Sequence, residues 1–161
     1  MSTAGAAGAG SPSARLAELG LELPGVPAPL AAYVPAVRTG DLVMTAGQLP
    51  MVDGQLVATG AVGGEVSPEQ AYDAARTAAL NGLAAVASVL GSLDEVTRVV
   101  RACVYVAAAP GFTALPQVAN GASDLLGEVF GDAGQHVRSA VGAAMLPLGA
   151  PVEVELTVQV G

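Results

Sequence analysis

The stretch HVRSAVGAAMLPLGAPVEVELTVQV, residues 136–160, decides the fold, because it predicts two strands joined by a turn rich in proline and glycine. In its second half, valine or leucine at the even positions of 152–158 alternates with polar residues at the odd positions, as in a strand with one apolar face. In its first half, Arg138 shares a face with small residues such as Ala140 and Gly142. An arginine among such small side chains has open space beside it, so we expect a small ligand or another subunit there.

The rest of the chain adds strands and helices to this pair. Ser67, Pro68 and Gln70 form the start signal of a long helix, with an N-cap serine, a proline in the first turn and a capping-box glutamine. That helix is expected to end near Gly91. Periodicity and turn signals predict the other elements: a short helix from Ser13 to Leu19, strands at 36–38 and 42–48, a turn at Asp53-Gly54, a strand at 96–106 and a helix at 114–130.

This element order indicates an α+β protein. Two long helices cover only one face of a sheet of this kind. The other face is expected to hold Arg138, Glu153 and Glu155 among small and apolar side chains. A face of that composition needs a cover, and we expect another subunit to supply it.

Length and composition favour one domain. The 161 residues include 52% apolar side chains, enough to bury a core, and we place the domain at residues 13–161. Residues 1–12 are small or polar without a cationic side chain, so we expect a disordered tail and no signal peptide. A single cysteine, Cys103, fits a reducing cytoplasm. The uncharged stretch 102–123 is interrupted by prolines and glycines, so no membrane partner is expected.

The charge pattern excludes several classes of function. The formal net charge is −8, from 14 acidic residues against six arginines, and the sequence contains no lysine. A nucleic-acid partner is not expected, because phosphates require a basic surface. Without lysine, the chain has neither a Schiff-base residue nor a P-loop lysine. His136 and Cys103 are the only soft ligand side chains, too few for a structural zinc site, so no metal is expected.

Several segments together resemble the Rid family, the reactive intermediate deaminases also called YjgF-like proteins. The resemblance covers roughly residues 33–160, nearly the whole of the expected domain. The segment 120–124 and the extended N-terminus are similar to a longer-chain branch of that family. The matching motifs are Thr45–Pro50, the strand Val99–Val106, and the ordered tail of Arg138-Ser139, Leu146-Pro147 and Val152–Glu155.

The resemblance implies both an assembly and an activity. The implied fold is a chorismate-mutase-like mixed sheet with two helices on one face, assembled as a homotrimer with ligand clefts between subunits. The implied activity is hydrolysis of 2-imino or enamine acids, products of pyridoxal-phosphate enzymes, to 2-keto acids and ammonia. The family reaction requires no cofactor. On this basis the protein is expected to be a cytoplasmic deaminase whose partner is a small imino acid or carboxylate.

The resemblance also assigns residues to the cleft. Arg138 matches the arginine that clamps the substrate carboxylate, a task that suits the planar donor fork of a guanidinium. Glu153 matches the glutamate that orients or activates the attacking water, a general acid/base role. Gly47 matches a glycine whose backbone approaches the ligand, and Asn120 matches a cleft asparagine. Tyr33 matches a cleft tyrosine, although packing explains a tyrosine there equally well.

Two positions depart from the family pattern. Ala46 stands where serine is frequent, and Ala140 stands where cysteine is frequent, so the expected pocket lacks a hydroxyl and a thiol. This loss favours an alternative function, a non-catalytic trimer that binds a small carboxylate as a sensor or scaffold. The presence of both Arg138 and Glu153 favours the enzyme. A ribonuclease or translation-inhibitor role, a label given to relatives, fits such an acidic chain badly.

The candidate residues also have structural interpretations. Arg138 would then form an ion pair with Glu153 or Glu155. Glu155 is as plausible as Glu153 for the acid/base role, because the two share a strand face. Cys103 is interpreted as core packing. His136 is interpreted as a solvent-exposed residue at the entrance of a strand, with a proton-transfer role as the alternative.

Overall fold

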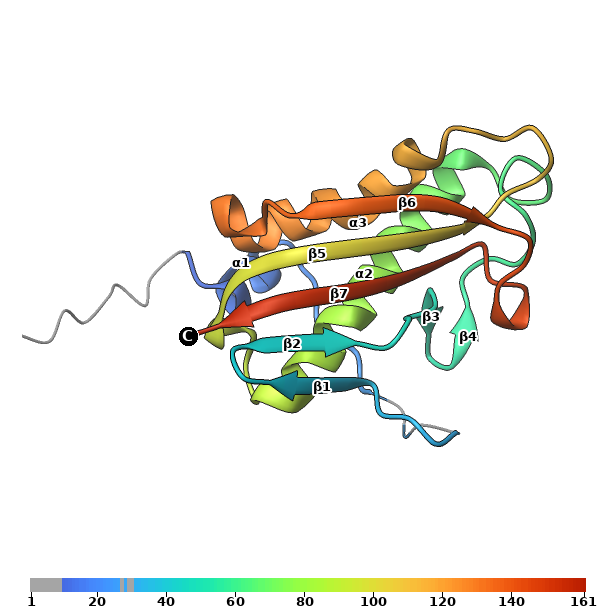
Figure 1. Ribbon diagram of the computed structural model, residues 1–161. Coiled ribbons are helices and arrows are strands. Elements are labelled where there is room, and N and C mark those ends of the chain that lie inside the picture. Colours follow the sequence, from blue (N-terminus) through green and yellow to red (C-terminus); the bar gives the residue numbers. More distant parts are fainter. Residues whose placement is uncertain (1–9, 27, 29–30) are drawn as a thin grey trace, which may run out of the picture.

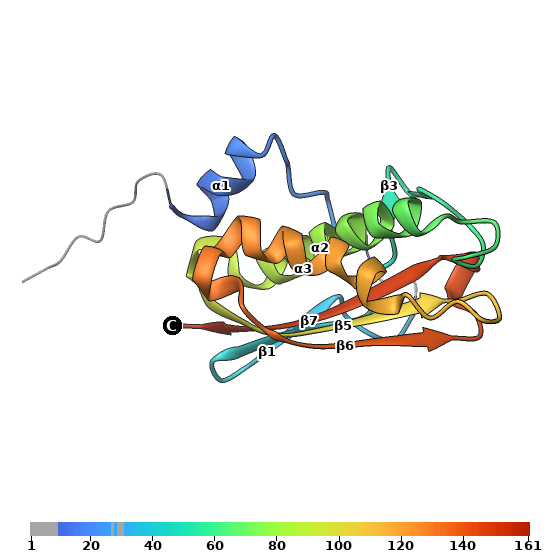
Figure 2. The ribbon, with the colours of Figure 1, turned by 90° about the horizontal axis from the view of Figure 1, so that it is seen from above.

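The computed structural model describes residues 10–26, 28 and 31–161. A five-stranded sheet has its helices on one side (Figures 1 and 2). The strands of this sheet are β1 (Ala36–Thr39), β2 (Leu42–Thr45), β5 (Val96–Ala107), β6 (Val137–Ala143) and β7 (Val152–Val160). A separate hairpin is formed by β3 (Met51–Val52) and β4 (Gln55–Leu56). The helices are α1 (Pro12–Glu18), α2 (Pro68–Leu90) and α3 (Leu115–Phe130), with 3-10 turns η1 (Leu93–Glu95), η2 (Gly131–Gly134) and η3 (Pro147–Gly149).

The two C-terminal strands are not neighbours in the sheet. The strand order is β1-β2-β7-β5-β6, so β5 lies between β6 and β7. β5 and β6 run parallel with α3 as their crossover connection, and the other pairs of this sheet are antiparallel. The turn at 144–151 therefore carries the chain past the end of β5 (Figure 1). The alternation of side chains predicts both strands, but it does not reveal the strand inserted between them.

Helix α2 begins and ends where the sequence predicts. The Ser67 hydroxyl accepts a hydrogen bond from the Gln70 backbone N–H (3.1 Å), and the Gln70 side chain accepts one from the Ser67 N–H (2.9 Å). Gly91 ends the helix in the left-handed conformation that glycine adopts readily. The buried face of α2 is mostly alanine, and a side chain at Gly121 of α3 would collide with the Tyr72 carbonyl of α2. The two helices therefore pack with their backbones close together.

A further helix, α1, packs on α3 on the side away from the sheet (Figure 2). Its cap is Ser11, whose hydroxyl accepts from the Ala14 N–H (3.2 Å), and the helix begins at Pro12. The predicted cap, Ser13, instead donates its backbone N–H to Asp94 Oδ1 (2.8 Å). The last three residues of the expected tail, 10–12, therefore belong to the described structure, with Ser11 as the cap and Pro12 as the first helical residue. Residues 1–9 lie outside the described residues.

The stretch 102–123 illustrates why uncharged sequence does not imply a membrane span. It forms the end of β5, a loop and the first half of α3. Among the helices of the described residues, none combines the length and the hydropathy needed to cross a membrane.

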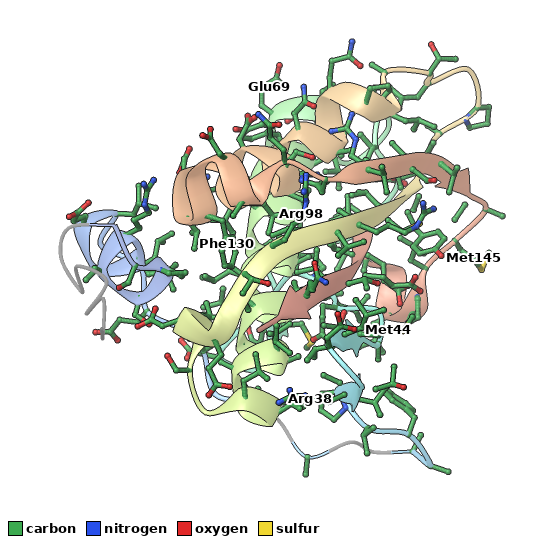
Figure 3. The ribbon with its side chains drawn as sticks, turned by 60° about the vertical axis from the view of Figure 1, so that its left-hand side comes forward. Arg38, Met44, Glu69, Arg98, Phe130 and Met145 are labelled. Atoms are coloured by element: carbon green, nitrogen blue, oxygen red, sulfur yellow. The ribbon has the colours of Figure 1, made fainter. Side chains whose placement is uncertain are left out.

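The face of the sheet opposite the helices is uncovered (Figure 2). Along β7, Leu156 and its apolar companions are buried beneath the helices, while Glu153 and Glu155 point to the uncovered side. Large apolar side chains lie exposed on this side too, from four positions on three strands: Val37, Met44 (labelled in Figure 3), Val137 and Val141. Such a mixture of exposed apolar and acidic side chains is typical of a surface that meets a partner.

Arg138 lies on the covered side of the sheet, and the expectation that it shares the open face with Glu153 is wrong. In the parallel pair of β6 and β5, Arg138 is opposite Ala102, and Ala102 is opposite the buried Leu156 of β7. Cys103 belongs to the adjacent row, opposite Glu155, on the uncovered side. Cys103 is buried, with 9% of its surface exposed, as core packing requires. It is not part of the core beneath the helices, however, because it lies on the other side of the sheet.

Candidate functional site

The residues singled out by the sequence form two groups on opposite sides of the sheet. The first group surrounds Arg138, on the helix-covered side at the edge strand β6. The second group surrounds Glu153, on the uncovered side of the central strand β7. Each group is built from segments that are far apart in sequence.

The Arg138 guanidinium is held by α3. Its Nη1 donates to Asn120 Oδ1 (2.8 Å) and to Ser123 Oγ (3.1 Å). Its Nη2 donates to the Pro116 carbonyl (3.4 Å). Asn120 and Ser123 are three positions apart and therefore share one face of the helix. The structure thus brings Asn120 and Arg138 together, as their places in the family pattern suggest.

No carboxylate lies within ion-pair distance of Arg138 in the part of the chain that the structure describes. The ion pair that the described residues do form joins Arg76 of α2 to Glu128 of α3 (2.7 Å). The structural interpretation, in which Arg138 pairs with Glu153 or Glu155, is therefore wrong for this chain. The hydrogen bonds above use both Nη1 hydrogens and one Nη2 hydrogen, which leaves the Nε–H and the second Nη2–H. Nε and Nη2 lie along one edge of the guanidinium, an edge that the two oxygens of a carboxylate match.

Ser123 also contacts the single histidine of the chain. Its Oγ lies 2.9 Å from His136 Nε2, and His136 Nδ1 lies 2.6 Å from the Gly134 carbonyl oxygen. Because a carbonyl oxygen only accepts, Nδ1 holds the hydrogen of the neutral ring, and Nε2 accepts from the Ser123 hydroxyl. His136 is therefore a half-buried member of a polar cluster and not a solvent-exposed residue at a strand entrance.

A hollow of about 370 Å³ opens beside this cluster. Small residues make the room for it, since three of its seven lining residues are glycine. This agrees with the expectation of open space near Arg138, although the space lies toward α3 and η2 and not along β6. The lining residues are Ser123, Gly127, Gly131, Gly134, Gln135, His136 and Arg138.

Glu153 lies against the backbone of Gly47. Gln48 and Val154 exchange two backbone hydrogen bonds (2.8 and 2.9 Å), which continue the contact between the end of β2 and β7. This pairing brings Gly47 so close to the Glu153 carboxylate that a side chain at position 47 would overlap it. The glycine therefore makes room for Glu153 itself, a reason that the sequence did not reveal.

The two carboxylates of β7 have different surroundings. Burial raises the pKa of Glu153, and the neighbouring charge of Glu155 raises it further. Glu155 accepts a hydrogen bond from the Tyr105 hydroxyl (3.4 Å). A hydrogen bond with Cys103 and the charge of Glu155 raise the pKa of Tyr105 to about 12. The proton affinity of Glu153 is thus increased, which favours it as a general acid/base.

The remaining cleft residues of the family pattern divide between the two sides. Tyr33 is 58% exposed and comes just before Pro35, whose carbonyl accepts a hydrogen bond from the Ala46 N–H (2.8 Å). Ala46 therefore lies beside Gly47 in the second group. Tyr33 lies two residues before Pro35, and its exposure means that packing within this chain does not explain it. Ala140 follows Arg138 on the covered side and packs against the core.

The sequence analysis missed Ser123 as a site residue. The available signal was its spacing of three from Asn120, which places both side chains on one helix face. The contact with His136 had no such signal, because it depends on how η2 returns the chain from α3 to β6.

Comparison with known proteins agrees with this architecture. Residues 13–159 match the family described as "YjgF/chorismate mutase-like, putative endoribonuclease". A Trypanosoma cruzi protein named "Protein TCP17" is 43% identical over 151 residues, which cover 93% of this chain and 94% of that protein. A crystal structure of a protein of unknown function from Agrobacterium tumefaciens is 41% identical, with a TM-score of 0.87 and coverage of 93% and 92% of the two chains. A "putative endoribonuclease" from Shewanella oneidensis is 34% identical, with a TM-score of 0.90 and coverage of 93% and 99%.

The fold and the two groups of residues thus define a chorismate-mutase-like α+β protein. The chain belongs to the YjgF family, as the motifs around Thr45, Arg138 and Glu153 predict. The names of these relatives are generic, and they give no role to any residue described above.

Proposed function

We propose that this protein hydrolyses reactive 2-imino and enamine acids to 2-keto acids and ammonia. The supporting observation is the Arg138 guanidinium, which is fixed by neutral oxygens of α3 and keeps a two-donor edge free of any carboxylate of the described residues. Such an edge suits the carboxylate that every 2-imino acid possesses. The resemblance to the Rid family supplies the reaction class.

A site that contains both Arg138 and Glu153 requires two copies of the chain. Within one copy, the two side chains belong to rows that face opposite sides of the sheet. Because β6 is an edge strand, Arg138 lies at the border of the sheet, where the uncovered face of another copy can reach it. We therefore propose a homotrimer in which each cleft combines Arg138 of one copy with Glu153 of the next.

The uncovered face supports this assembly. Val137 is 62% exposed in the single chain, and Met44 and Val141 lie on the same face. Burying such side chains against another copy stabilises an oligomer by about 25 cal/mol for each square ångström of apolar surface removed from water. Closed symmetry would bury every copy of this face at once.

In the proposed reaction, Arg138 binds the substrate carboxylate and so fixes the position of the C=N carbon. Glu153 accepts a proton from a water molecule, whose oxygen then bonds to that carbon. The raised pKa of Glu153 suits it to hold this proton and to return it to the nitrogen. As the water oxygen bonds to carbon, the π electrons of the C=N bond move to the nitrogen, which takes the proton from Glu153 and becomes an amine. The new hydroxyl group then gives its proton, through Glu153, to this amine. The C–N bond breaks, ammonia leaves, and the C–O bond becomes the C=O bond of the ketone.

A second candidate function is supported by two alanines. Ala46 and Ala140 place methyl groups where family members frequently have a hydroxyl and a thiol. A trimer with these residues binds a small carboxylate through Arg138 without turning it over, and serves as a sensor or scaffold.

The test is ammonia release from imino acids generated in the assay by an amino-acid oxidase. We expect the protein to accelerate release above the rate in buffer, and Arg138→Ala to remove the acceleration. Light scattering on the same sample should report three chains. If no substrate is accelerated but small 2-keto acids still bind, the sensor or scaffold function replaces the enzyme.

A further inference from the structure

We propose that Ser123 and His136 are positioning residues for Arg138, and that they select the edge of its guanidinium that meets a ligand carboxylate. This inference rests on the proposed role of Arg138 as the carboxylate clamp. It adds to that role a hydrogen-bond chain that runs from the Gly134 carbonyl through His136 and Ser123 to the guanidinium.

The first step is the geometry of the guanidinium. Its five N–H donors lie in one plane, so two acceptors on the same Nη1 atom fix both the plane and its rotation. Asn120 supplies one acceptor (2.8 Å), and Ser123 supplies the other (3.1 Å). With Nη1 occupied from both sides, the edge formed by Nε and Nη2 is the one presented to a ligand.

The second step is the direction of each hydrogen bond. A serine hydroxyl rotates freely and is either a donor or an acceptor. In a neutral His136 ring whose Nδ1–H donates to the Gly134 carbonyl (2.6 Å), Nε2 only accepts, and this sets the direction of the hydrogen bond with Ser123. The Ser123 hydrogen therefore points to His136 (2.9 Å), which turns an oxygen lone pair toward Arg138.

The third step is that Ser123 is diverted from its usual partner. A serine inside a helix commonly donates to the carbonyl one turn earlier in the same helix. Within the described residues, the side chain of Ser123 instead bonds to His136 and Arg138, both beyond the helix it belongs to. The cluster borders the hollow beside Arg138, so it acts where a ligand has room.

The first measurement uses the fact that His136 is the only histidine in the chain. Its ring nitrogens therefore give unambiguous nuclear magnetic resonance signals, which are recorded at pH 8. We expect the Nδ1–H tautomer, and we expect both Ser123→Ala and Arg138→Ala to move the Nε2 signal. The opposite tautomer, or an Nε2 signal that neither variant moves, would contradict the proposed series of hydrogen bonds from Gly134 to Arg138.

The second measurement is calorimetric titration with pyruvate, a small 2-keto acid. Ser123→Ala should weaken binding by about three- to thirtyfold, the scale for residues that act on a ligand through another residue. Ser123→Thr keeps the hydroxyl and should restore most of the affinity. The matched control is Tyr72→Phe, which removes a hydrogen bond from the Tyr72 hydroxyl to Asp124 (2.7 Å). Asp124 follows Ser123 in α3, so this variant also removes a side-chain hydrogen bond of that helix. It should leave the affinity for pyruvate unchanged.

The outcomes separate this inference from the proposed function. Equal losses in Ser123→Ala, Ser123→Thr and Tyr72→Phe would show a general effect on α3 and would overturn the positioning role. Full affinity in Ser123→Ala would also overturn it. If the unmutated protein does not bind pyruvate or hydrolyse imines, the proposed function fails, while the resonance measurement, which needs no ligand, still decides whether the chain exists.

Discussion

The two faces of the sheet differ in composition and in what their side chains contribute. The covered face is filled by valine, leucine and alanine, and no polar or charged side chain of the described residues is buried. The uncovered face combines carboxylates with exposed valines and a methionine. Stability is therefore concentrated on one face, which leaves the other free for recognition. Arg138 lies at the border between them, on the covered side but at an edge strand.

The largest expected effect compares neighbours of β7 that point to opposite faces. Leu156→Ala should lower the free energy of unfolding by about 2–5 kcal/mol, because the leucine fills the space beside Gly82 and rigid helix backbone cannot close the cavity. Thr157→Ala, on the uncovered face, should cost less than about 1 kcal/mol. Urea denaturation of both variants measures the difference. Similar losses would show that the two faces contribute equally to stability.

The next effect concerns the two carboxylates of the uncovered face. Glu153→Gln should reduce imine turnover by about 10²-fold or more, the scale of general acid/base assistance, while carboxylate binding persists. Glu155→Gln is the matched control, because it removes a like charge from the same strand face one repeat further along. Initial rates of ammonia release measure both variants. Equal losses would indicate a general electrostatic or assembly effect.

A smaller effect is expected on the covered side. Arg138→Ala should weaken the binding of small 2-keto acids by about 1.5–3 kcal/mol, as for a hydrogen bond to a charged group. Arg98→Ala removes the same charge from an exposed position of β5, labelled in Figure 3, and should change the affinity little. Calorimetry compares the two variants. Unchanged affinity in Arg138→Ala would mean that the anion binds elsewhere.

The smallest effect is a dependence of stability on pH. The pKa of Glu153 is raised above its ordinary value of 4.5, so the folded chain binds more protons than the unfolded chain between pH 4.5 and the raised value. In that window the free energy of unfolding falls as the pH rises, and the loss persists at neutral pH. Glu153→Gln should flatten this slope in denaturation series from about pH 4 to pH 7. Identical slopes in the two proteins would mean that Glu153 titrates normally.

Much of the fold follows from local sequence. The capping box at Ser67, the stop at Gly91 and the alternation in β7 predict their elements correctly, because each depends on neighbouring residues alone. Strand order depends on contacts between distant segments, so β5 between β6 and β7 could not be predicted this way. The same limit explains why the side of the sheet was predicted wrongly for Arg138. Alternation shows that Arg138 and Val137 point to opposite faces, but it does not show which of these faces the helices cover.

The candidate site was predictable only in part. Family motifs identified Arg138, Asn120, Gly47 and Glu153, and the structure joins them in pairs, Arg138 with Asn120 and Gly47 with Glu153. The argument for Glu153 as the acid/base residue rests on its burial and on the neighbouring charge, neither of which the alternation of side chains reveals. These roles in catalysis and binding stay predictions until the variants are measured.

The close approach of Gly47 and Glu153 constrains the order in which a lineage can change them. While the glutamate is present, a methyl group at position 47 would displace its carboxylate. Once the glutamate is replaced by a small residue, alanine at position 47 is accommodated, since Gly47 has no left-handed backbone to protect, and alanine reduces the entropy of the unfolded chain. After both changes, restoring the glutamate alone meets the new methyl group. The carboxylate would then have to take another position than the one it has beside Gly47.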